Sequence, residues 1–254
     1  MSTILAKHRS RVMLFASVIC ILVAGGAVAP ALARQEDSAD DGFTQTFYME
    51  RCTWSTTGQN LFFSLNPGTR HVHEGEEDGE AARLITTVLG KTKQVAGVPT
   101  RVIEERHYVN GELFEVSRNF YSMCRENNSV FYFGEEVDFY EDGQIIGHDG
   151  AWLAGSDGAQ PGLYMPGLPL LGARYYQEIA PDAALDRAEI VSVTAAADVP
   201  AGSFEQCIET LETTPLEPGS ESIKVYCPDV GIVDDDGLVL VKYHAGRPGR
   251  WLGR

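Results

Sequence analysis

Apolar and polar positions alternate in short runs from residue 46 onward, and these runs are rich in β-branched and aromatic side chains. Pairs of turn-forming residues separate the runs, and no stretch has the 3.6-residue apolar spacing of an amphipathic helix. The clearest pair of runs covers residues 100–109 and 112–123, because Asn110-Gly111 supplies the two positive-φ positions of a type I′ hairpin turn. The pattern therefore predicts an all-β protein built from antiparallel hairpins.

Similar turn signals extend this hairpin into a meander. Glu77-Asp78-Gly79 separates two upstream runs, and Glu141-Asp142-Gly143 separates two downstream runs. Roughly ten antiparallel strands joined by short turns would expose edges and one whole face as a flat sheet. We therefore expect a single domain over residues 45–246, in which the antiparallel meander forms a curved sheet, a half-barrel or a barrel; a two-sheet sandwich is the alternative. The expected strands are 71–76, 80–92, 100–109, 112–123, 130–140, 144–150, 174–179, 184–197, 203–213, 221–228 and 238–244.

One segment breaks the alternation. Residues 155–172, GSDGAQPGLYMPGLPLLG, contain five glycines and three prolines, a composition that favours neither helix nor strand, yet they include several large apolar side chains. Because prolines restrict the backbone, we expect an ordered loop that crosses an open end or face of the sheet with its apolar side chains inward. The loop forms either the wall of a ligand cavity or a plug of the core. The residues expected to bind the ligand are Trp152, Leu163, Tyr164, Met165 and Leu168.

The chain begins like a secretory signal peptide. Residues 1–33 join a basic start to an apolar run and end in Ala31-Leu32-Ala33, a small-x-small cleavage pattern. An uncleaved membrane anchor is the alternative, because residues 12–33 are long enough to span a bilayer. After cleavage we expect a disordered acidic spacer at 34–44, no stable membrane span, and a basic tail at 247–254. The mature protein is then secreted, or it lies in the periplasm or cell envelope.

The charge of the mature chain is strongly negative. The full sequence has a formal net charge of −16, and removal of residues 1–33 takes away three basic residues and no acidic one, which leaves −19. Nucleic acid binding depends on basic patches, and the basic residues cluster only in the short tail with Arg247, Arg250 and Arg254. The charge therefore excludes nucleic acid as a partner and otherwise indicates a solvated surface.

Four cysteines remain in the mature chain, an even number that indicates two disulfides in an exported protein. A hairpin centred on Glu217 would pair residues whose numbers sum to 434. Cys207 and Cys227 are such a pair, and directly opposed residues of antiparallel strands lie close to disulfide distance. We therefore predict a bond between Cys207 and Cys227, and by elimination a bond between Cys52 and Cys124.

Candidates for metal or catalytic chemistry are weak. His71 and His73 would share one strand face, the simplest geometry for Zn²⁺, Cu²⁺ or Ni²⁺, but a structural metal site usually needs four ligands, and we expect an exposed pair. Asp234-Asp235-Asp236-Gly237 lacks the spacing of a calcium loop and predicts a hairpin turn. Glu135-Glu136 is expected on a solvated strand face. The chain has no nucleophile elbow and no cysteine left for catalysis, so we expect no cofactor and do not favour an enzyme.

The chain contains several short motifs: Trp152-x-x-Gly155, Gly158-Ala159-Gln160-Pro161-Gly162, Met165-Pro166, Tyr176-Gln177-Glu178, Val199-Pro200-Ala201-Gly202-x-Phe204 and Thr214-Pro215-Leu216-Glu217-Pro218-Gly219. Together they resemble the motifs of a family of exported bacterial β-rich proteins without an assigned activity. The resemblance runs from about Phe62 to Val233. Cys227-Pro228-Asp229-Val230-Gly231 stands where that family usually has Ala-Pro-Gly-Val-Gly, so Cys227 looks like a local addition. The resemblance implies an architecture similar to the curved half-barrels that carry lipids or lipoproteins across the bacterial envelope.

The sequence thus favours a non-enzymatic, exported binding protein whose curved sheet holds an apolar or amphipathic small molecule. Two alternatives stay open. One is a barrel-type enzyme in which Tyr, Asp or His side chains inside the cavity transfer protons, and the other is a surface protein that binds divalent cations.

Overall fold

Tight two-residue turns organise the part of the chain that the computed structural model describes, residues 42–246. Both central residues have positive φ at Asp78-Gly79 (52° and 81°), at Asn110-Gly111 (51° and 83°) and at Asp236-Gly237 (53° and 93°). Aspartate, asparagine and glycine tolerate this left-handed backbone, and paired positive φ values match the twist of the flanking strands. Each turn therefore joins two antiparallel strands, as the sequence predicts.

Strands make up the regular structure of residues 42–246, apart from one short 3-10 helix, Met49–Arg51. The prediction of an all-β protein is therefore confirmed. The strands are β1 (Trp54–Ser55), β2 (Gln59–Asn60), β3 (Phe63–Ser64), β4 (Arg70–Glu77), β5 (Glu80–Val95), β6 (Val98–Val109), β7 (Glu112–Cys124), β8 (Val130–Glu141), β9 (Gln144–Gly147), β10 (Trp152–Leu153), β11 (Gln160–Met165), β12 (Arg174–Tyr176), β13 (Glu178–Ile179), β14 (Arg187–Val199), β15 (Gly202–Thr213), β16 (Glu221–Cys227), β17 (Gly231–Asp235) and β18 (Leu238–His244).

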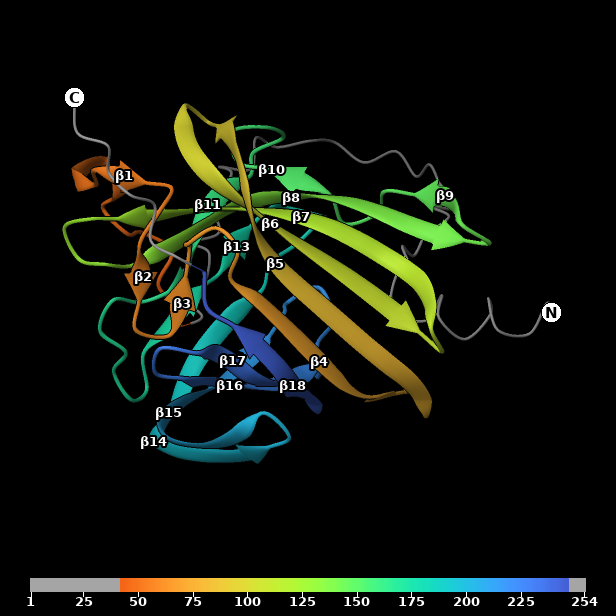
Figure 1. Ribbon diagram of the computed structural model, residues 1–254. Coiled ribbons are helices and arrows are strands. Elements are labelled where there is room, and N and C mark those ends of the chain that lie inside the picture. The colour runs from red at the N-terminus through yellow and green to blue at the C-terminus, as the bar shows by residue number, and fades with distance from the viewer. Residues whose placement is uncertain (1–41, 247–254) are drawn as a thin grey trace, which may run out of the picture. The chain divides into compact units, whose positions relative to one another are not determined.

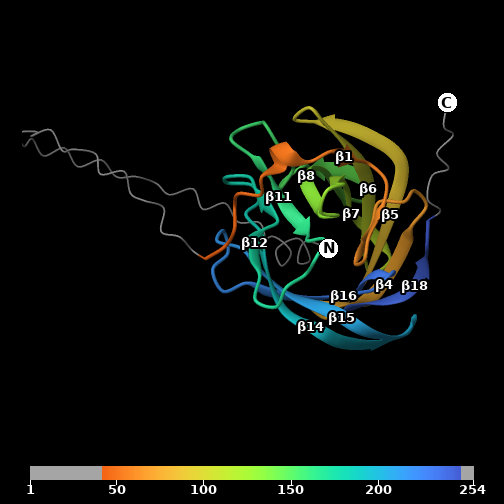
Figure 2. The ribbon, with the colours of Figure 1, turned by 90° about the vertical axis from the view of Figure 1, so that its left-hand side faces the viewer.

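One large antiparallel sheet contains nearly all of these strands. Sixteen strands belong to it, in the order β12-β14-β15-β16-β17-β18-β4-β5-β6-β7-β8-β11-β13, with β1 paired to β7 and with β9 and β10 paired to β8. Figure 1 shows the long strands β5 to β8 side by side, and Figure 2, turned by 90°, shows the strands passing round a ring. The sheet is thus nearly closed and barrel-like, and the alternative of a two-sheet sandwich is wrong.

One continuous segment closes the barrel. β12 and β13 stand at opposite ends of the strand order, yet only Gln177 separates them in the chain. β12 pairs with β14, whereas β13 pairs with β11, where Pro161 lies opposite Glu178. Gly162 in β11 allows close contact at this point, since a Cβ atom there would overlap the carbonyl group of Gln177. Residues 174–179, which we call the closing segment, therefore belong to both edges of the sheet.

The β2–β3 hairpin covers one end of the barrel. The side-chain amide of Asn60 donates a 2.9 Å hydrogen bond to the carbonyl oxygen of Pro166, just after β11. The backbone N–H of Asp229, between β16 and β17, donates a 2.8 Å hydrogen bond to the carbonyl oxygen of Leu61. Leu65, next to the hairpin, is fully buried in the main apolar core. The hairpin therefore spans between two distant parts of the barrel wall.

Both predicted disulfides are present, and the predicted hairpin register is confirmed. The Cys207–Cys227 bond joins β15 to β16, and Ile208 pairs with Tyr226, so that the residue numbers sum to 434 as expected. This bond lies in a second, smaller apolar cluster with the buried side chains of Val233 and Leu240.

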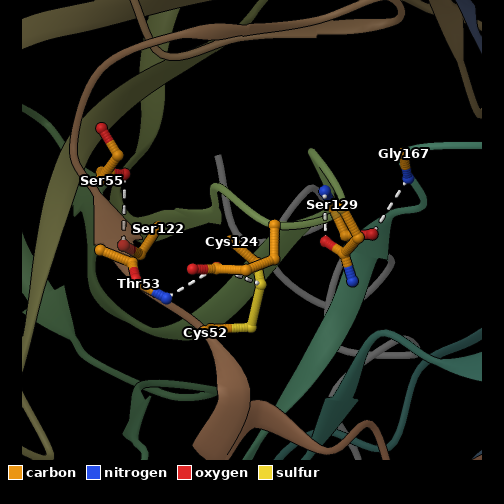
Figure 3. The surroundings of a disulfide bond; sticks show 9 residues. Cys52, Thr53, Ser55, Ser122, Cys124, Ser129 and Gly167 are labelled. Atoms are coloured by element: carbon orange, nitrogen blue, oxygen red, sulfur yellow. Dashed lines mark hydrogen bonds between the residues drawn. A yellow bond between two sulfur atoms is a disulfide. The ribbon is translucent and has the colours of Figure 1, made fainter.

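The Cys52–Cys124 bond ties the segment before β1 to the end of β7. Figure 3 shows the hydrogen bonds that surround it. The hydroxyl of Ser122 donates to the carbonyl oxygen of Ser55 at 3.3 Å, and the backbone N–H of Gly167 donates to the hydroxyl oxygen of Ser129 at 3.0 Å. The disulfide therefore lies where β1, β7 and the chain after β11 meet.

The segment 155–172 differs from the expectation, because its middle part forms the strand β11. Leu163 pairs with Phe131 in β8, and Pro161 faces only the two-residue strand β13. A proline is tolerated near the start of a short, weakly paired strand, so tertiary pairing overrides the local composition. The expectation of an ordered loop over residues 155–172 is therefore wrong for residues 160–165, which form a strand. Residues 231–235 also form a strand, β17, which the pattern did not predict.

Residues 42–246 fall within one compact unit, in agreement with the expected single β domain. The predicted signal peptide at 1–33, residues 34–41 of the predicted spacer and the basic tail at 247–254 lie outside the described residues. Between residues 42 and 246, no helix has the length and hydropathy needed to cross a membrane.

Candidate functional site

The register of the sheet shows which side chains face the barrel interior. Paired residues of neighbouring antiparallel strands point to the same face, and Thr210 of β15, Lys224 of β16 and Asp235 of β17 are paired in this way. Glu105 of β6 lies within electrostatic reach of Lys224 and Asp235, although three strands separate β6 from β17 in the sheet. Such side chains meet only across the interior. This face of the strands is therefore the inner face of the barrel.

Lys224 is the centre of an ion-pair network on the inner face. Its Nζ atom lies 3.1 Å from Oε2 of Glu212 and 3.2 Å from Oδ1 of Asp235. The side-chain amide of Gln177, from the closing segment, donates a 2.9 Å hydrogen bond to Oε1 of Glu212. Burial acts to lower the pKa of Lys224, but Asp235 and Glu212 outweigh it and raise this pKa well above its usual range. Lys224 is therefore fully charged and already neutralised by two carboxylates.

Burial is the main cause of the raised pKa of Glu212, whereas the raised pKa of Lys224 comes from its two carboxylate partners. Burial raises the pKa of Glu212, and the attraction of Lys224 opposes this without cancelling it. The 3.1 Å contact shows that the two groups are paired. The side chains of Glu212, Lys224 and Asp235 keep 12%, 22% and 20% of their surface exposed. No protein atom covers this part of their surface, so solvent or a ligand can reach it.

Three further carboxyl groups on the inner face resist ionisation. Burial, together with the charge of Asp235, raises the pKa of Glu105 to about 7. Burial and neighbouring carboxyl groups also raise the pKa of Glu135. The pKa of Glu178 is raised well above its usual range by burial and by the charge of Asp186. The interior thus holds more carboxyl groups than its one lysine can neutralise. We call Glu105, Glu135, Glu178, Glu212 and Asp235 the carboxylate cluster.

Nearer the β2–β3 hairpin, the inner face is aromatic. The rings of Tyr121 and Tyr132 stack with centroids 4.7 Å apart, and Tyr164 packs edge-on against Tyr121 at 4.9 Å. Phe63 of the hairpin contacts Tyr164 at 5.0 Å, and Trp152 contacts Tyr132 at 5.3 Å. These edge-to-face and stacked contacts stabilise a packed aromatic group. We call these five residues the aromatic layer.

Among the buried hydroxyl groups near Glu212, those of Tyr175 and Thr210 have no hydrogen-bond partner among residues 42–246. Their residues are 3% and 1% exposed. Tyr175 lies within electrostatic reach of Glu212, and Thr210 shares a strand face with it. A buried polar group without a partner costs about 1–3 kcal/mol, so such groups are few in folded proteins. Both hydroxyls thus have free hydrogen-bonding capacity beside the carboxylate cluster.

The structure places the five expected ligand-binding residues in different surroundings. Trp152 and Tyr164 lie in the aromatic layer of the inner face. Met165 is 1% exposed in the main core, and Leu163 packs partly buried against the same core. Leu168, which follows β11 in the chain, is 75% exposed. The expectation that Leu168 points inward is therefore wrong.

His71 and His73 share one strand face, as predicted, but the expectation of an exposed pair is wrong. They are 8% and 0% exposed, because the connection between β16 and β17 covers their rings. Their Nε2 atoms lie 2.7 Å and 3.1 Å from the carbonyl oxygens of Val230 and Ile232. A carbonyl group only accepts, so each Nε2 carries the proton and offers no lone pair to a metal. Burial lowers the pKa of His71 to about 4.

The carboxylate cluster was missed in the sequence because the alternation does not show which face is internal. Glu135 and Glu136 are neighbours in β8, and only Glu136 is exposed. Glu135 lies opposite Trp152 of β10 in the sheet. The expectation of a solvated face is thus wrong for Glu135 and right for Glu136. The sequence offers only a partial signal: Leu211 separates Thr210 from Glu212, and Lys224 lies between Ile223 and Val225, so these polar residues share a face apart from their apolar neighbours.

Comparisons with known proteins add little to this picture. No family model matches the chain, and no curated protein matches it. Among solved structures, the chain is similar to a candidate lipoprotein from Parabacteroides distasonis, with 12% sequence identity and a TM-score of 0.36. The likeness covers 74% of this chain and 100% of that chain. The resemblance to a family of exported bacterial proteins therefore rests on the short motifs alone.

Proposed function

We propose that this protein is an exported binding protein that holds one amphipathic small molecule inside its barrel. The observation that carries the proposal is the division of the inner face into the aromatic layer and the carboxylate cluster, beside which the hydroxyls of Tyr175 and Thr210 lack partners. An apolar part of the ligand would lie against the aromatic layer, and a polar part would lie among the carboxyl groups. The two disulfides support a location in an oxidising compartment.

Native mass spectrometry of protein purified from its own host tests this proposal. We expect a copurified molecule at a one-to-one ratio that collisional activation releases. The matched variants are Ser222→Trp and Ile223→Trp. These neighbours on β16 point to opposite faces of the sheet, since Ser222 pairs with the inward Glu212 and Ile223 does not. Ser222→Trp should lower the bound fraction, and Ile223→Trp should leave it unchanged. An empty wild-type protein that also takes up no added amphiphile would overturn the proposal.

The raised pKa values of Glu105 and Glu135 favour a second candidate, an enzyme that uses a protonated carboxyl group as a general acid near neutral pH. Incubation of the protein with its copurified molecule distinguishes the two functions. A binding protein returns the molecule unchanged, whereas an enzyme releases a product and loses this ability in Glu135→Gln.

A further inference from the structure

We infer that the polar part of the ligand is a cation of the ammonium type, held by the carboxylate cluster and the unpartnered hydroxyls of Tyr175 and Thr210. This inference rests on the proposed function, because it assigns the chemistry of the same interior site. The inference also extends the proposed function, since an acidic interior selects a cationic ligand over an anionic one.

The first step concerns the balance of charge. Lys224 contacts two carboxylates, Glu212 and Asp235, at 3.1 and 3.2 Å, so its own charge is satisfied. Glu105, Glu135 and Glu178 face the same interior without a cationic partner at salt-bridge distance among residues 42–246. A cation that enters would favour the ionised form of these carboxyl groups, which burial otherwise disfavours, whereas an anion would have to displace the carboxylates that already hold Lys224. The interior therefore favours positive charge.

The second step concerns hydrogen bonds. An ammonium group has only donors, and it needs several acceptors at once. Tyr175 and Thr210 present hydroxyl oxygens that no group within residues 42–246 uses, beside the carboxyl group of Glu212. Hydroxyl and carboxylate oxygens together complete the coordination of such a donor. The free hydroxyls thus supply hydrogen-bond acceptors for the cation that the charge balance favours.

The third step concerns the neighbouring rings. The aromatic layer adjoins the carboxylate cluster, since the Trp152 ring contacts Tyr132 and its indole N–H bonds to Glu178. Faces of tyrosine and tryptophan rings attract ammonium groups and also pack against alkyl chains. An alkylammonium ligand would therefore use both parts of the inner face at once.

Three probes that share one alkyl tail but differ in head group test the inference: decylammonium, decanol and decanoate. Each is titrated into the protein by calorimetry at pH 7, below its micelle-forming concentration. Spermidine serves as a cation that lacks the tail. We expect decylammonium to bind tighter than decanol and decanoate by about tenfold or more, the effect of one hydrogen bond between charged groups. Equal affinities, or a preference for decanoate, would overturn the cation inference and leave the proposed binding of amphiphiles standing.

Matched variants locate the effect. Glu135→Gln removes an inward carboxyl group, and Glu136→Gln removes its outward neighbour, which pairs with Lys93 on the outer surface. Glu135→Gln should weaken decylammonium binding about fivefold without changing decanol binding, and Glu136→Gln should change neither. Glu105→Gln and Glu104→Gln form a second such pair on β6, in case Glu135→Gln does not fold. If spermidine alone binds and depends on Glu135, the amphiphile proposal fails and the cation inference holds; if no probe binds, both fail.

Discussion

The indole N–H of Trp152 donates a 2.7 Å hydrogen bond to Oε2 of Glu178, and the two residues are only 6% and 8% exposed. Trp152 belongs to β10, whereas Glu178 belongs to the closing segment. The bond therefore ties β10, which pairs with β8, to the closing segment. It also supplies a donor to a carboxyl group that burial disfavours in its charged form.

Trp152→Phe keeps an aromatic ring but removes this donor. We expect the free energy of unfolding to fall by about 1–3 kcal/mol beyond the loss of ring area, because Glu178 is left without its partner. Urea unfolding at pH 7 measures this, with Trp54→Phe as the control for ring size. In a Glu178→Met background the extra loss should vanish, and its persistence there would show that the hydrogen bond is not its cause.

Glu105 should make the folded protein less stable as the pH rises. Its pKa is about 7 in the fold and near 4.5 when unfolded, so between these values the unfolded chain loses a proton that the folded protein keeps. The contribution is absent below pH 4.5 and reaches an upper bound of roughly 3 kcal/mol above pH 7. Glu105→Gln should thus gain stability relative to wild type over this range. Denaturant unfolding from pH 4 to 8 measures the gain, and profiles parallel to those of wild type and Glu104→Gln would contradict it.

His71 should have the opposite effect on acidification. Burial lowers its pKa from 6.5 to about 4, so the folded protein excludes a proton that the unfolded chain binds. The stability from this group is complete above pH 6.5 and is lost as the pH falls towards 4, by roughly 3 kcal/mol in all. His71→Gln keeps a side-chain donor for Val230 but does not titrate. Its stability should therefore decline less between pH 7 and 4 than that of wild type or of the exposed control His244→Gln, as followed by thermal melting.

Met165→Ala and Leu168→Ala should separate core from surface within the segment 155–172. Met165 is 1% exposed, so its truncation should cost about 2–5 kcal/mol from the lost contacts and the cavity that remains. Leu168 is 75% exposed, so its truncation should change the free energy of unfolding by about 0.5 kcal/mol or less. Chemical denaturation of each single variant measures both values. A large loss on Leu168→Ala would mean that something covers this side chain in solution.

The two disulfides should stabilise the protein unequally. Cys52–Cys124 closes a loop of 72 positions and Cys207–Cys227 one of 20, so the longer loop removes more entropy from the unfolded chain. The loop-entropy relation gives roughly 4 kcal/mol for the first and roughly 3 kcal/mol for the second. Removal of each pair by double Cys→Ala substitution and urea unfolding checks the order. A larger loss for the Cys207 and Cys227 pair would show that native-state contacts outweigh chain entropy.

Local signals were sufficient for the hairpins. Asn110-Gly111 and Asp236-Gly237 fix the turn, and the period of two fixes which residues share a face, so strand positions and the register of Cys207 and Cys227 could be predicted. Those signals are contained within about twenty residues of chain. The all-β barrel followed from them because so many strands need closure.

The closure itself and the site could not be predicted in the same way. Residues 160–165 look like a loop by composition, and they form β11 only because β8 and the closing segment pair with them. Glu135 and Glu136 were both expected on a solvated face, because the inner face is defined by strands that lie far apart in the sequence. The same holds for His71, whose burial depends on a connection more than 150 positions away.

The closing segment has a consequence for how the barrel assembles. In most closed sheets the joining contacts are remote in sequence, but here Pro161 and Glu178 are 17 positions apart, so the seam between β11 and β13 is a short-range contact. The remote pairing is that of β18 with β4, where Val239 lies opposite Glu74, 165 positions away. Loop closure over such a distance opposes folding more than any other step in this topology. The rate of folding should therefore depend on the meeting of β4 and β18, long after the seam has formed within its own stretch of chain.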